Sequence, residues 1–487
     1  MIGELKPYPA MKDSGVEWLG EVPEHWEVRR LRNVAGLRVS NIDKHSRDGE
    51  EPVRLCNYVD VYKHDRITPE MAFMKATATR AEVERFRLHV DDVLITKDSE
   101  TWNDIGVPSL VDGAADDLVS GYHLALLRPF QDRIKGGFLF RMFQSSAGAY
   151  QFHVEAKGVT RYGLAHGSIK SVALPVPPIP EQAAIARFLD HADRRIRRYI
   201  RAKQKLIKLL EEQKQAIIHR AVTRGLDPDV PLKDSGVEWL GEVPEHWKVV
   251  RLKFIAAQIA DCLHATPVYS EDGEYPAIRT ADVQPGKVNI ESARRVEERQ
   301  YQRWTSRMVP QGGDILYSRE GERFGIAAPV PEGSRLCISQ RMMTFRIRAE
   351  HHAGFIMWQI NTRHVYAQAA ADQIGAAAPH VNVGRIRNFE LVLPPRWEQE
   401  QIDEHIAAAL IAPDKAIEQA RREIRLLREL RTRLIADVVT GKLDVRQVAA
   451  RLPEDDGDTV DEADYLDEDE PALEDMDLEA ELEEIEA

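Results

Sequence analysis

The sequence predicts two mixed α/β (α+β) globular domains, separated by a long antiparallel two-helix coiled coil and related by a pseudo-two-fold internal repeat. Three observations predict this fold class. A segment of 15 residues occurs twice. In each copy, short strand-like runs then alternate with Gly- and Pro-bearing loops, as in a mixed α/β domain. Each copy ends in a long helical segment whose apolar residues follow a heptad spacing.

The composition is that of a globular protein with several domains. The chain has 487 residues, of which 43% are hydrophobic and 30% are charged. It has no apolar run of the roughly 18 residues that a membrane helix needs, and its N-terminus lacks the apolar stretch of a secretory signal. Cys56, Cys262 and Cys337 are too few and too far apart for a disulfide framework or a Cys-based zinc module. We therefore expect a cytoplasmic protein with no membrane partner.

The net charge of −14 is unevenly distributed. Residues 453–487 hold 19 of the 80 Asp and Glu residues and no Lys or Arg, so the remaining 61 acidic residues face 66 basic ones. Residues 1–452 are therefore mildly basic, which is compatible with a DNA partner. We expect the acidic tail to be disordered, and the alternative is a short partner-binding helix with Leu478, Leu482 and Ile485 on one face.

The repeat defines the domain organisation. The segment KDSGVEWLGEVPEHW spans 12–26 and returns at 233–247. Further matches at an offset of 217 pair 169–178 with 386–395, Glu181-Gln182 with Glu398-Gln399, and Val222-Thr223 with Val439-Thr440. Between these matches the two copies differ, which suggests two modules that do the same kind of job on different targets.

Within each copy, the first 150 or so residues carry strand-like runs, at 92–96 and 124–127 in one copy and at 314–317 and 343–347 in the other. The duplicated Trp18 and Trp26, with Trp239 and Trp247, are interpreted as packing anchors at the start of each domain. The expected boundaries are 1–27 for the first repeated segment, 28–178 for the first globular domain, 179–225 for the first helix, 226–248 for the linker and second repeated segment, 249–395 for the second globular domain, 396–442 for the second helix and 443–487 for the disordered tail.

Both long helices follow a Pro-Pro pair and end at a glycine, Gly225 or Gly441. In steps of 4 and 3, apolar or small residues recur from Ile185 to Ile217 and from Ile402 to Leu434. Pro413 interrupts the second series and is expected to kink or restart that helix. The apolar faces of the two helices are expected to pack against each other. The helices run antiparallel if a two-fold axis relates the two copies. The predicted seam residues are Ile196, Leu206, Leu210, Ile217, Leu427, Leu430 and Leu434.

These features together resemble the specificity subunit of type I restriction–modification systems. The resemblance rests on KDSGVEWLGEVPEHW, on the Pro-Pro-x-x-Glu-Gln sequence before each helix and on Val-Thr-Arg-Gly-Leu at 222–226, and it covers residues 1–450. It implies two target-recognition domains on an antiparallel coiled-coil spacer, each reading one half of a bipartite, non-palindromic target in double-stranded DNA. It also implies a non-catalytic subunit that recruits two methyltransferase (M) subunits and two restriction/translocase (R) subunits. The acidic tail and Pro413 depart from the family pattern.

Motifs for catalysis are missing from the sequence. A base-modifying methyltransferase needs an Asn/Asp-Pro-Pro-aromatic sequence, whereas the Pro-Pro pairs here lie in Val-Pro-Pro-Ile (176–179) and Leu-Pro-Pro-Arg (393–396). No phosphate-binding G-x-x-x-x-G-K-[ST] occurs, and the histidines lack the spacing of metal ligands. We therefore expect no catalytic residue, no metal and no cofactor. The alternatives are a self-sufficient restriction or DNA-methyltransferase enzyme and a coiled-coil scaffold with no DNA role.

Candidate DNA contacts lie in matched loops. Lys97 and Arg319 each follow a matched strand, which can present a basic loop to a groove or to phosphates; a solvated loop is the alternative. Thr160, Arg161 and Tyr162 combine a donor, a guanidinium and a ring, which suit base readout; a turn with a packed tyrosine is the alternative. The candidate set is Lys97, Thr160, Arg161, Tyr162, Arg279, Arg319, Arg341 and His380.

The first helix is strongly basic. From Glu181 to Arg224 it carries 12 basic and 5 acidic residues. A track for the phosphates of unread DNA, a surface for the methyltransferase partner and a merely solvated helix face are the three interpretations of this charge.

Overall fold

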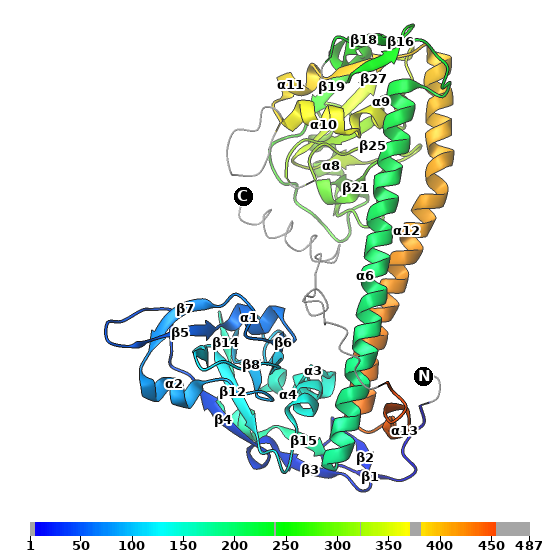
Figure 1. Ribbon diagram of the computed structural model, residues 1–487. Helices are drawn as coiled ribbons and strands as arrows, with labels where there is room; N and C mark the ends of the chain where they lie inside the picture. Colours follow the sequence, from blue (N-terminus) through cyan, green and yellow to red (C-terminus); the bar gives the residue numbers. More distant parts are fainter. Residues whose placement is uncertain (1–4, 238–239, 322, 371–380, 454–487) are drawn as a thin grey trace. The chain divides into compact units, whose positions relative to one another are not determined.

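The computed structural model describes residues 5–237, 240–321, 323–370 and 381–453, which form two compact units (Figure 1). Unit 1 contains the described residues up to Gln204 and those from Arg421 onward, and unit 2 contains 205–420. Each unit holds one globular region together with one segment of each long helix. No helix among the described residues combines the length and the apolar character that crossing a membrane requires.

The globular region of unit 1 is built on a five-stranded sheet with strand order β4-β12-β8-β10-β6. Smaller sheets have the orders β11-β5-β7, β13-β14-β9, β15-β3 and β1-β2. The strands are β1 (Met11–Asp13), β2 (Glu21–Pro23), β3 (Glu27–Arg30), β4 (Ala35–Val39), β5 (Glu51–Cys56), β6 (Arg66–Ile67), β7 (Met74–Ala78), β8 (Val93–Thr96), β9 (Asp98–Ser99), β10 (Pro108–Val111), β11 (Leu118–Ser120), β12 (Leu124–Pro129), β13 (Lys157–Gly158), β14 (Tyr162–Gly163) and β15 (Ala173–Val176). The helices are η2 (Leu31–Asn33), α1 (Tyr58–Lys63), α2 (Arg80–Phe86), α3 (Gly136–Gln144), α4 (Ser146–Glu155) and α5 (His166–Ser171).

The globular region of unit 2 repeats this topology. Its main sheet has the order β19-β27-β24-β25, which matches β4-β12-β8-β10, and β26-β20-β23 matches β11-β5-β7. The strands are β16 (Leu232–Asp234), β17 (Glu242–Pro244), β18 (Lys248–Arg251), β19 (Ala256–Asp261), β20 (Tyr275–Ile278), β21 (Val283–Gln284), β22 (Lys287–Val288), β23 (Arg295–Val296), β24 (Ile315–Ser318), β25 (Ala327–Pro329), β26 (Cys337–Ile338), β27 (Met342–Ile347) and β28 (Glu390–Leu393). The helices are α7 (Leu252–Ile255), η3 (Thr280–Asp282), α8 (Glu298–Trp304), α9 (Ala353–Ile360), α10 (Arg363–Ala370) and α11 (Val383–Arg387). The predicted repeat of two mixed α/β domains is confirmed.

The long helices α6 (Ile179–Arg224) and α12 (Arg396–Val439) are present in both units. Their segments lie side by side within each unit (Figure 1). In unit 1, Arg431 pairs with Asp193 and Glu423 pairs with Lys203, so residue numbers rise along one helix as they fall along the other. The two segments in unit 1 are therefore antiparallel.

The least exposed stripe on these helices departs from the predicted seam. Ile196 and Leu434 are buried, whereas Leu206 and Leu430 are 40% and 37% exposed. Ile207 and Arg431, one position further along, are less exposed than these leucines. A straight α-helix drifts by about 20° per heptad relative to a strict seven-residue repeat, so a stripe extrapolated over many turns moves away from the contact.

The predicted restart at Pro413 is wrong, because α12 continues through this residue without a break. A proline in a helix interior costs roughly 3 kcal/mol, since it removes one hydrogen bond and crowds the preceding turn. Leu410 and Ile417 flank Pro413 on the same helix, and both are buried. Breaking the helix at Pro413 would expose these side chains, which offsets the cost of the proline.

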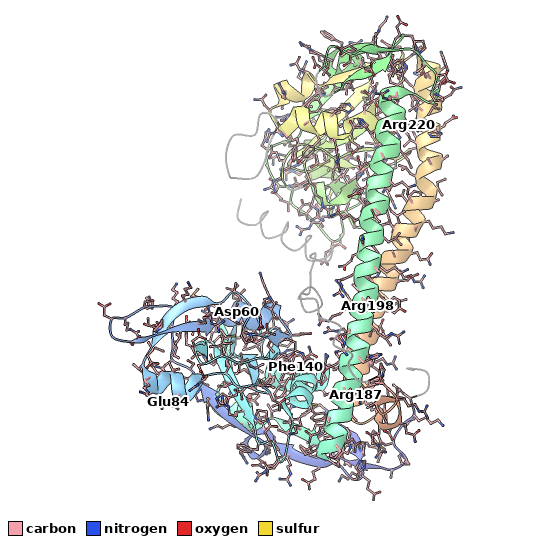
Figure 2. The ribbon with its side chains drawn as sticks, in the orientation of Figure 1. Asp60, Glu84, Phe140, Arg187, Arg198 and Arg220 are labelled. Carbon is pink, nitrogen blue, oxygen red and sulfur yellow. The ribbon has the colours of Figure 1, made fainter. Side chains whose placement is uncertain are left out.

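The predicted start of the disordered tail at residue 443 is also wrong. Residues Arg446–Ala449 form α13, and Val445, Val448 and Leu452 are buried in the main core of unit 1. Arg187 on α6, which is labelled in Figure 2, donates to the backbone carbonyl of Leu452 at 2.6 Å. The proposed partner-binding helix at 478–485 lies outside the described residues.

Each repeated segment ends in a tryptophan that locks the start of a long helix. Trp26 is fully buried, and its indole N–H donates to Glu181 in the first turn of α6 at 3.0 Å. Trp247 is also fully buried and donates to Glu398 of α12 at 3.1 Å. The interpretation of Trp26 and Trp247 as packing anchors is confirmed. Trp18 is half-buried, and Trp239 lies outside the described residues.

Candidate nucleic-acid interface

Two of the predicted contact segments meet in the small sheet β13-β14-β9 of unit 1. In this sheet Tyr162 is paired with Ser99, and Gly163 with Asp98. The backbone of Lys97 is held on both sides, because its N–H donates to His123 at 3.1 Å and its carbonyl accepts from Leu164 at 2.9 Å. The fold thus brings the strand-end cation beside the hairpin that carries Thr160 and Arg161.

The ammonium group of Lys97 is paired with the neighbouring carboxylate. Lys97 Nζ and His123 Nδ1 both lie 2.9 Å from Oδ2 of Asp98. Burial tends to raise the pKa of Asp98, but the hydrogen bonds from His123 and Lys97 outweigh burial and lower this pKa below its usual value. A DNA phosphate would have to compete with this carboxylate for Lys97, so Lys97 is less available than its position in sequence indicates.

The tip of the β13–β14 hairpin presents its polar side chains to solvent. Thr160 and Arg161 are exposed, whereas Tyr162 is partly buried and packs against the main core. A side chain on Gly158 would collide with the carbonyl oxygen of Arg161, so the close approach of the two strands requires glycine there. The tip therefore offers a hydroxyl and a guanidinium, while the tyrosine ring serves to anchor the hairpin.

Aromatic rings near this sheet were missed by the sequence analysis: Tyr62 and Tyr122 are exposed, and Tyr58 is partly buried. Tyr58 and Tyr62 on α1 stack with their centroids 5.5 Å apart, and the Tyr58 side chain shares a hydrogen bond with Ser99 of β9. Tyr122 packs against His123, the partner of Asp98. The i, i+4 spacing of Tyr58 and Tyr62 was a usable signal for one helix face, but sequence does not distinguish an exposed ring from a core ring.

The strand-end cation of unit 2 has the same backbone environment. The Arg319 N–H donates to the Arg341 carbonyl at 3.0 Å, and the Arg319 carbonyl accepts from Val381 at 3.1 Å. Its side chain is only 8% exposed and pairs with Asp261 at 2.9 Å and with Glu320 at 2.8 Å. Arg341 is half-buried with a positive φ of 68°, which places it at a tight bend before β27.

The remaining predicted residues do not join this arrangement. Arg279 pairs with the buried Asp282 at 3.3 Å and is largely buried itself, so it stabilises the turn at η3. His380 lies outside the described residues. Unit 2 has a polar hollow of about 620 Å³, lined in part by residues that follow His380 in the sequence. Its lining residues are Arg251, Gln368, Asn382, Gly384, Arg385, Asn388 and Glu390. Across the described ranges, no group of three or more His, Cys, Asp or Glu side chains could hold a metal ion.

Replacing Arg161 with alanine should weaken recognition by unit 1 without weakening its fold. An exposed arginine that contacts a guanine edge contributes about 1–3 kcal/mol, so we expect about a tenfold or greater loss of affinity for one half of the target. Fluorescence anisotropy with a cognate duplex measures this loss. Arg80→Ala on α2, which is equally solvent-exposed, is the matched control and should leave the affinity unchanged. Equal affinities for Arg161→Ala and the unchanged chain would exclude Arg161 from the interface.

The two units define a class of protein with two globular domains of one topology and different surface side chains. Residues 23–209 and 244–426 match the type I restriction modification DNA specificity domain. Because this match covers most of the chain, the protein belongs to the family of type I restriction–modification DNA specificity subunits.

One relative matches most of the chain, and another matches about three fifths of it. A protein of Methanocaldococcus jannaschii assigned as the MjaX type I restriction enzyme specificity subunit is 23% identical over 445 residues, which cover 88% of this chain and 96% of the relative. The EcoKI specificity subunit of Escherichia coli is 22% identical over 308 residues, 62% of each chain. A solved chain from work on assembly and conformational transition of the type I R-M system has the same fold, with a TM-score of 0.59, 15% identity and coverage of 86% of this chain and 98% of that chain.

Proposed function

We propose that this specificity subunit reads a bipartite, non-palindromic DNA sequence, with one half read by the globular region of each unit. The observation that carries the proposal is the equivalent placement of Lys97 and Arg319 in two sheets of the same topology. Their surroundings differ, because Lys97 is joined by His123 and a hairpin with Arg161, whereas Arg319 is joined by Asp261 and Arg341. Equal frameworks with different side chains around the equivalent position are suited to two different half-sites.

We further propose that α6 and α12 form one antiparallel coiled coil that separates the two readers. The helices have 46 and 44 residues, or about 69 Å and 66 Å at 1.5 Å per residue. Supporting contacts occur in both units, since Lys203 pairs with Glu423 in unit 1 and Lys214 pairs with Asp414 in unit 2. Readers held at a fixed separation select half-sites one helical turn of DNA apart, or a multiple of a turn.

The proposed partners are double-stranded DNA, two methyltransferase subunits and two restriction/translocase subunits, and the chain itself has no catalytic role. Exposed cations along α6 include Arg195, Arg198 and Lys205 (Figure 2 labels Arg198). This face could contact the phosphates of the unread base pairs or a methyltransferase subunit. The salt dependence of DNA binding by Arg198→Ala distinguishes the phosphate contact from the methyltransferase contact. Loss of one phosphate contact reduces the slope of the logarithm of the binding constant against the logarithm of salt concentration by about one.

A reconstitution experiment tests the proposed function. The purified chain alone, with S-adenosylmethionine and DNA, should transfer no methyl groups and cut no DNA, whereas the chain with its methyltransferase subunits should methylate one bipartite sequence. Sequencing of modified bases in the treated DNA gives the target. Activity of the chain alone would support the self-sufficient enzyme, and no sequence-specific binding in either state would support the scaffold.

A further inference from the structure

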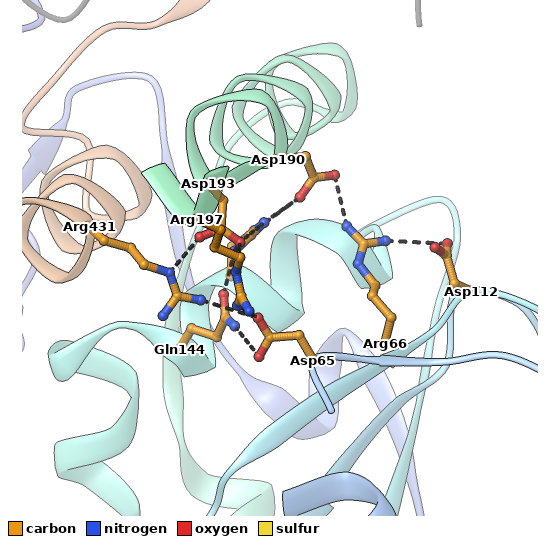
Figure 3. A network of polar contacts seen from close by, with 9 residues as sticks. Asp65, Arg66, Asp112, Gln144, Asp190, Asp193, Arg197 and Arg431 are labelled. Atoms are coloured by element: carbon orange, nitrogen blue, oxygen red, sulfur yellow. Dashed lines mark hydrogen bonds and ion pairs between the residues drawn. The ribbon is translucent and has the colours of Figure 1, made fainter. Parts of the chain in front are cut away.

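A network of charged side chains joins the globular region of unit 1 to both long helices (Figure 3). Its members come from four places: the strand β6 and its neighbours, α3, α6 and α12. They are Asp65, Arg66, Asp112, Arg141, Gln144, Asp190, Asp193, Arg197 and Arg431.

Two carboxylates at the centre of the network bridge the elements. Asp193 on α6 accepts from Arg141 of α3 at 3.3 Å and from Arg431 of α12 at 2.5 Å. Asp65, just before β6, accepts from the same Arg431 at 3.2 Å and from Arg197 of α6. Arg431 therefore contacts one carboxylate on the neighbouring helix and one on the globular region, which the forked guanidinium geometry permits.

The network is charge-balanced, with four arginines and four aspartates. Arg141, Arg197 and Asp193 are buried. Burial alone would raise the pKa of Asp193, but Arg141, Arg431 and Arg197 outweigh burial and hold this pKa well below its usual value. Buried ion pairs of this kind add little net stability, but breaking one leaves an uncompensated charge, so they favour one arrangement of the groups over others.

Unit 2 has no such network at the corresponding positions of its described residues. With the offset of 217, Trp358 stands where Arg141 is, Leu410 where Asp193 is and Ala407 where Asp190 is. In unit 2, other groups join the globular region to α12. Asp403 on α12 accepts from Trp358 at 2.7 Å and contacts His352 at 2.6 Å. The arginine network is thus a particular property of unit 1 and not of the repeated framework.

We propose that Arg431, Asp193 and Asp65 are positioning residues that fix the orientation of the first globular region on its helices and thereby set the number of unread base pairs. This inference rests on the proposed bipartite readout. If the paired helices separate the readers, the distance between half-sites depends on how firmly each reader is held on its own helix segments. Arg431 and Asp193 each contact both the other long helix and the globular region.

The test uses the full chain assembled with its methyltransferase subunits. Substrates carry the identified half-sites with the natural spacer, or with a spacer one base pair shorter or longer. For Arg431→Met, the preference for the natural spacer should fall about tenfold, or about 1.4 kcal/mol, while the sequences of both half-sites stay the same. A loss of folded protein would lower methylation of all spacers by one common factor, so the ratio between spacers isolates the positioning role.

Three further variants complete the design. Arg431→Met with Asp193→Asn removes two opposite charges together, so it leaves no single charge buried in their place, and it should lose the spacer preference while folding normally. Arg431→Lys keeps the charge and should restore the preference in part. Arg428→Met, an exposed arginine nearby on α12, should retain the natural preference. An unchanged spacer ratio in Arg431→Met or in the double variant would overturn the inference. If the unchanged complex methylates no bipartite sequence at all, the proposed function fails instead.

Discussion

Replacing Trp26 with alanine should lower the free energy of unfolding of unit 1 by about 3–5 kcal/mol, the usual cost of removing a buried tryptophan. Trp26 is fully buried in the main core. Its loss also removes a hydrogen bond to Glu181, a buried carboxylate that keeps Tyr8 and His25 as partners. Hydrogen exchange resolved by peptide measures this loss, because it reports opening of each unit separately.

The repeat supplies a matched variant for this experiment. Trp247→Ala should weaken unit 2 by a similar amount, since Trp247 is equally buried and donates to Glu398. Trp397→Ala is the control, because Trp397 is 59% exposed and its truncation should change stability by no more than about 0.5 kcal/mol. If Trp26→Ala and Trp397→Ala have equal effects, the tryptophan anchor is not what holds the repeated segment to the helix.

Exchanging residues 28–168 for the equivalent segment of another family member should change one half of the methylated sequence completely. The physical reason is that the exchanged segment contains β4 to β14, including the hairpin with Arg161, but neither long helix. The second half-site should stay the same. The number of unread base pairs should also stay the same when the donor segment carries the residues equivalent to Asp65 and Arg141, which contact the long helices. Sequencing of modified bases in DNA treated with the reconstituted complex measures all three quantities.

The matched exchange of 249–385 should change the other half-site instead. Together the two chimaeras assign each half-site to one unit. A chimaera in which both half-sites change would show that the two globular regions act as one joint reader. A changed spacer with unchanged half-sites would place the spacing in the exchanged segment, and the long helices would then not be the spacer.

The elements that sequence predicted best depend on short-range rules. The run at 92–96 became β8 at Val93–Thr96, and the helix predicted at 179–225 became α6 at Ile179–Arg224. Both follow from periodicity in one continuous segment. The buried face of α6 beyond Leu206 was less predictable, because this face drifts slightly relative to the heptad repeat at each turn and the drift accumulates along a long helix.

Features that depend on distant partners were not predictable. Nothing in the sequence near Arg319 indicates that Asp261 neutralises it, because the pairing joins the ends of β19 and β24, which lie on either side of β27. Packing likewise explains why α12 continues through Pro413 and why residues 443–452 fold. The sequence predicted the hairpin and the strand end as separate candidate loops, and the structure places them in one small sheet. The availability of each cation likewise required the structure.

The cores of the two units exchange helix ends between the copies of the repeat. Leu434, Val438 and Val439, from the end of the second copy, lie in the main core of unit 1. Ile218 and Val222, from the end of the first copy, lie in the main core of unit 2. This arrangement is a domain swap contained within a single chain. One copy of the repeat alone would lack the helix end that completes its core, so its buried apolar residues would need the helix end of a second copy.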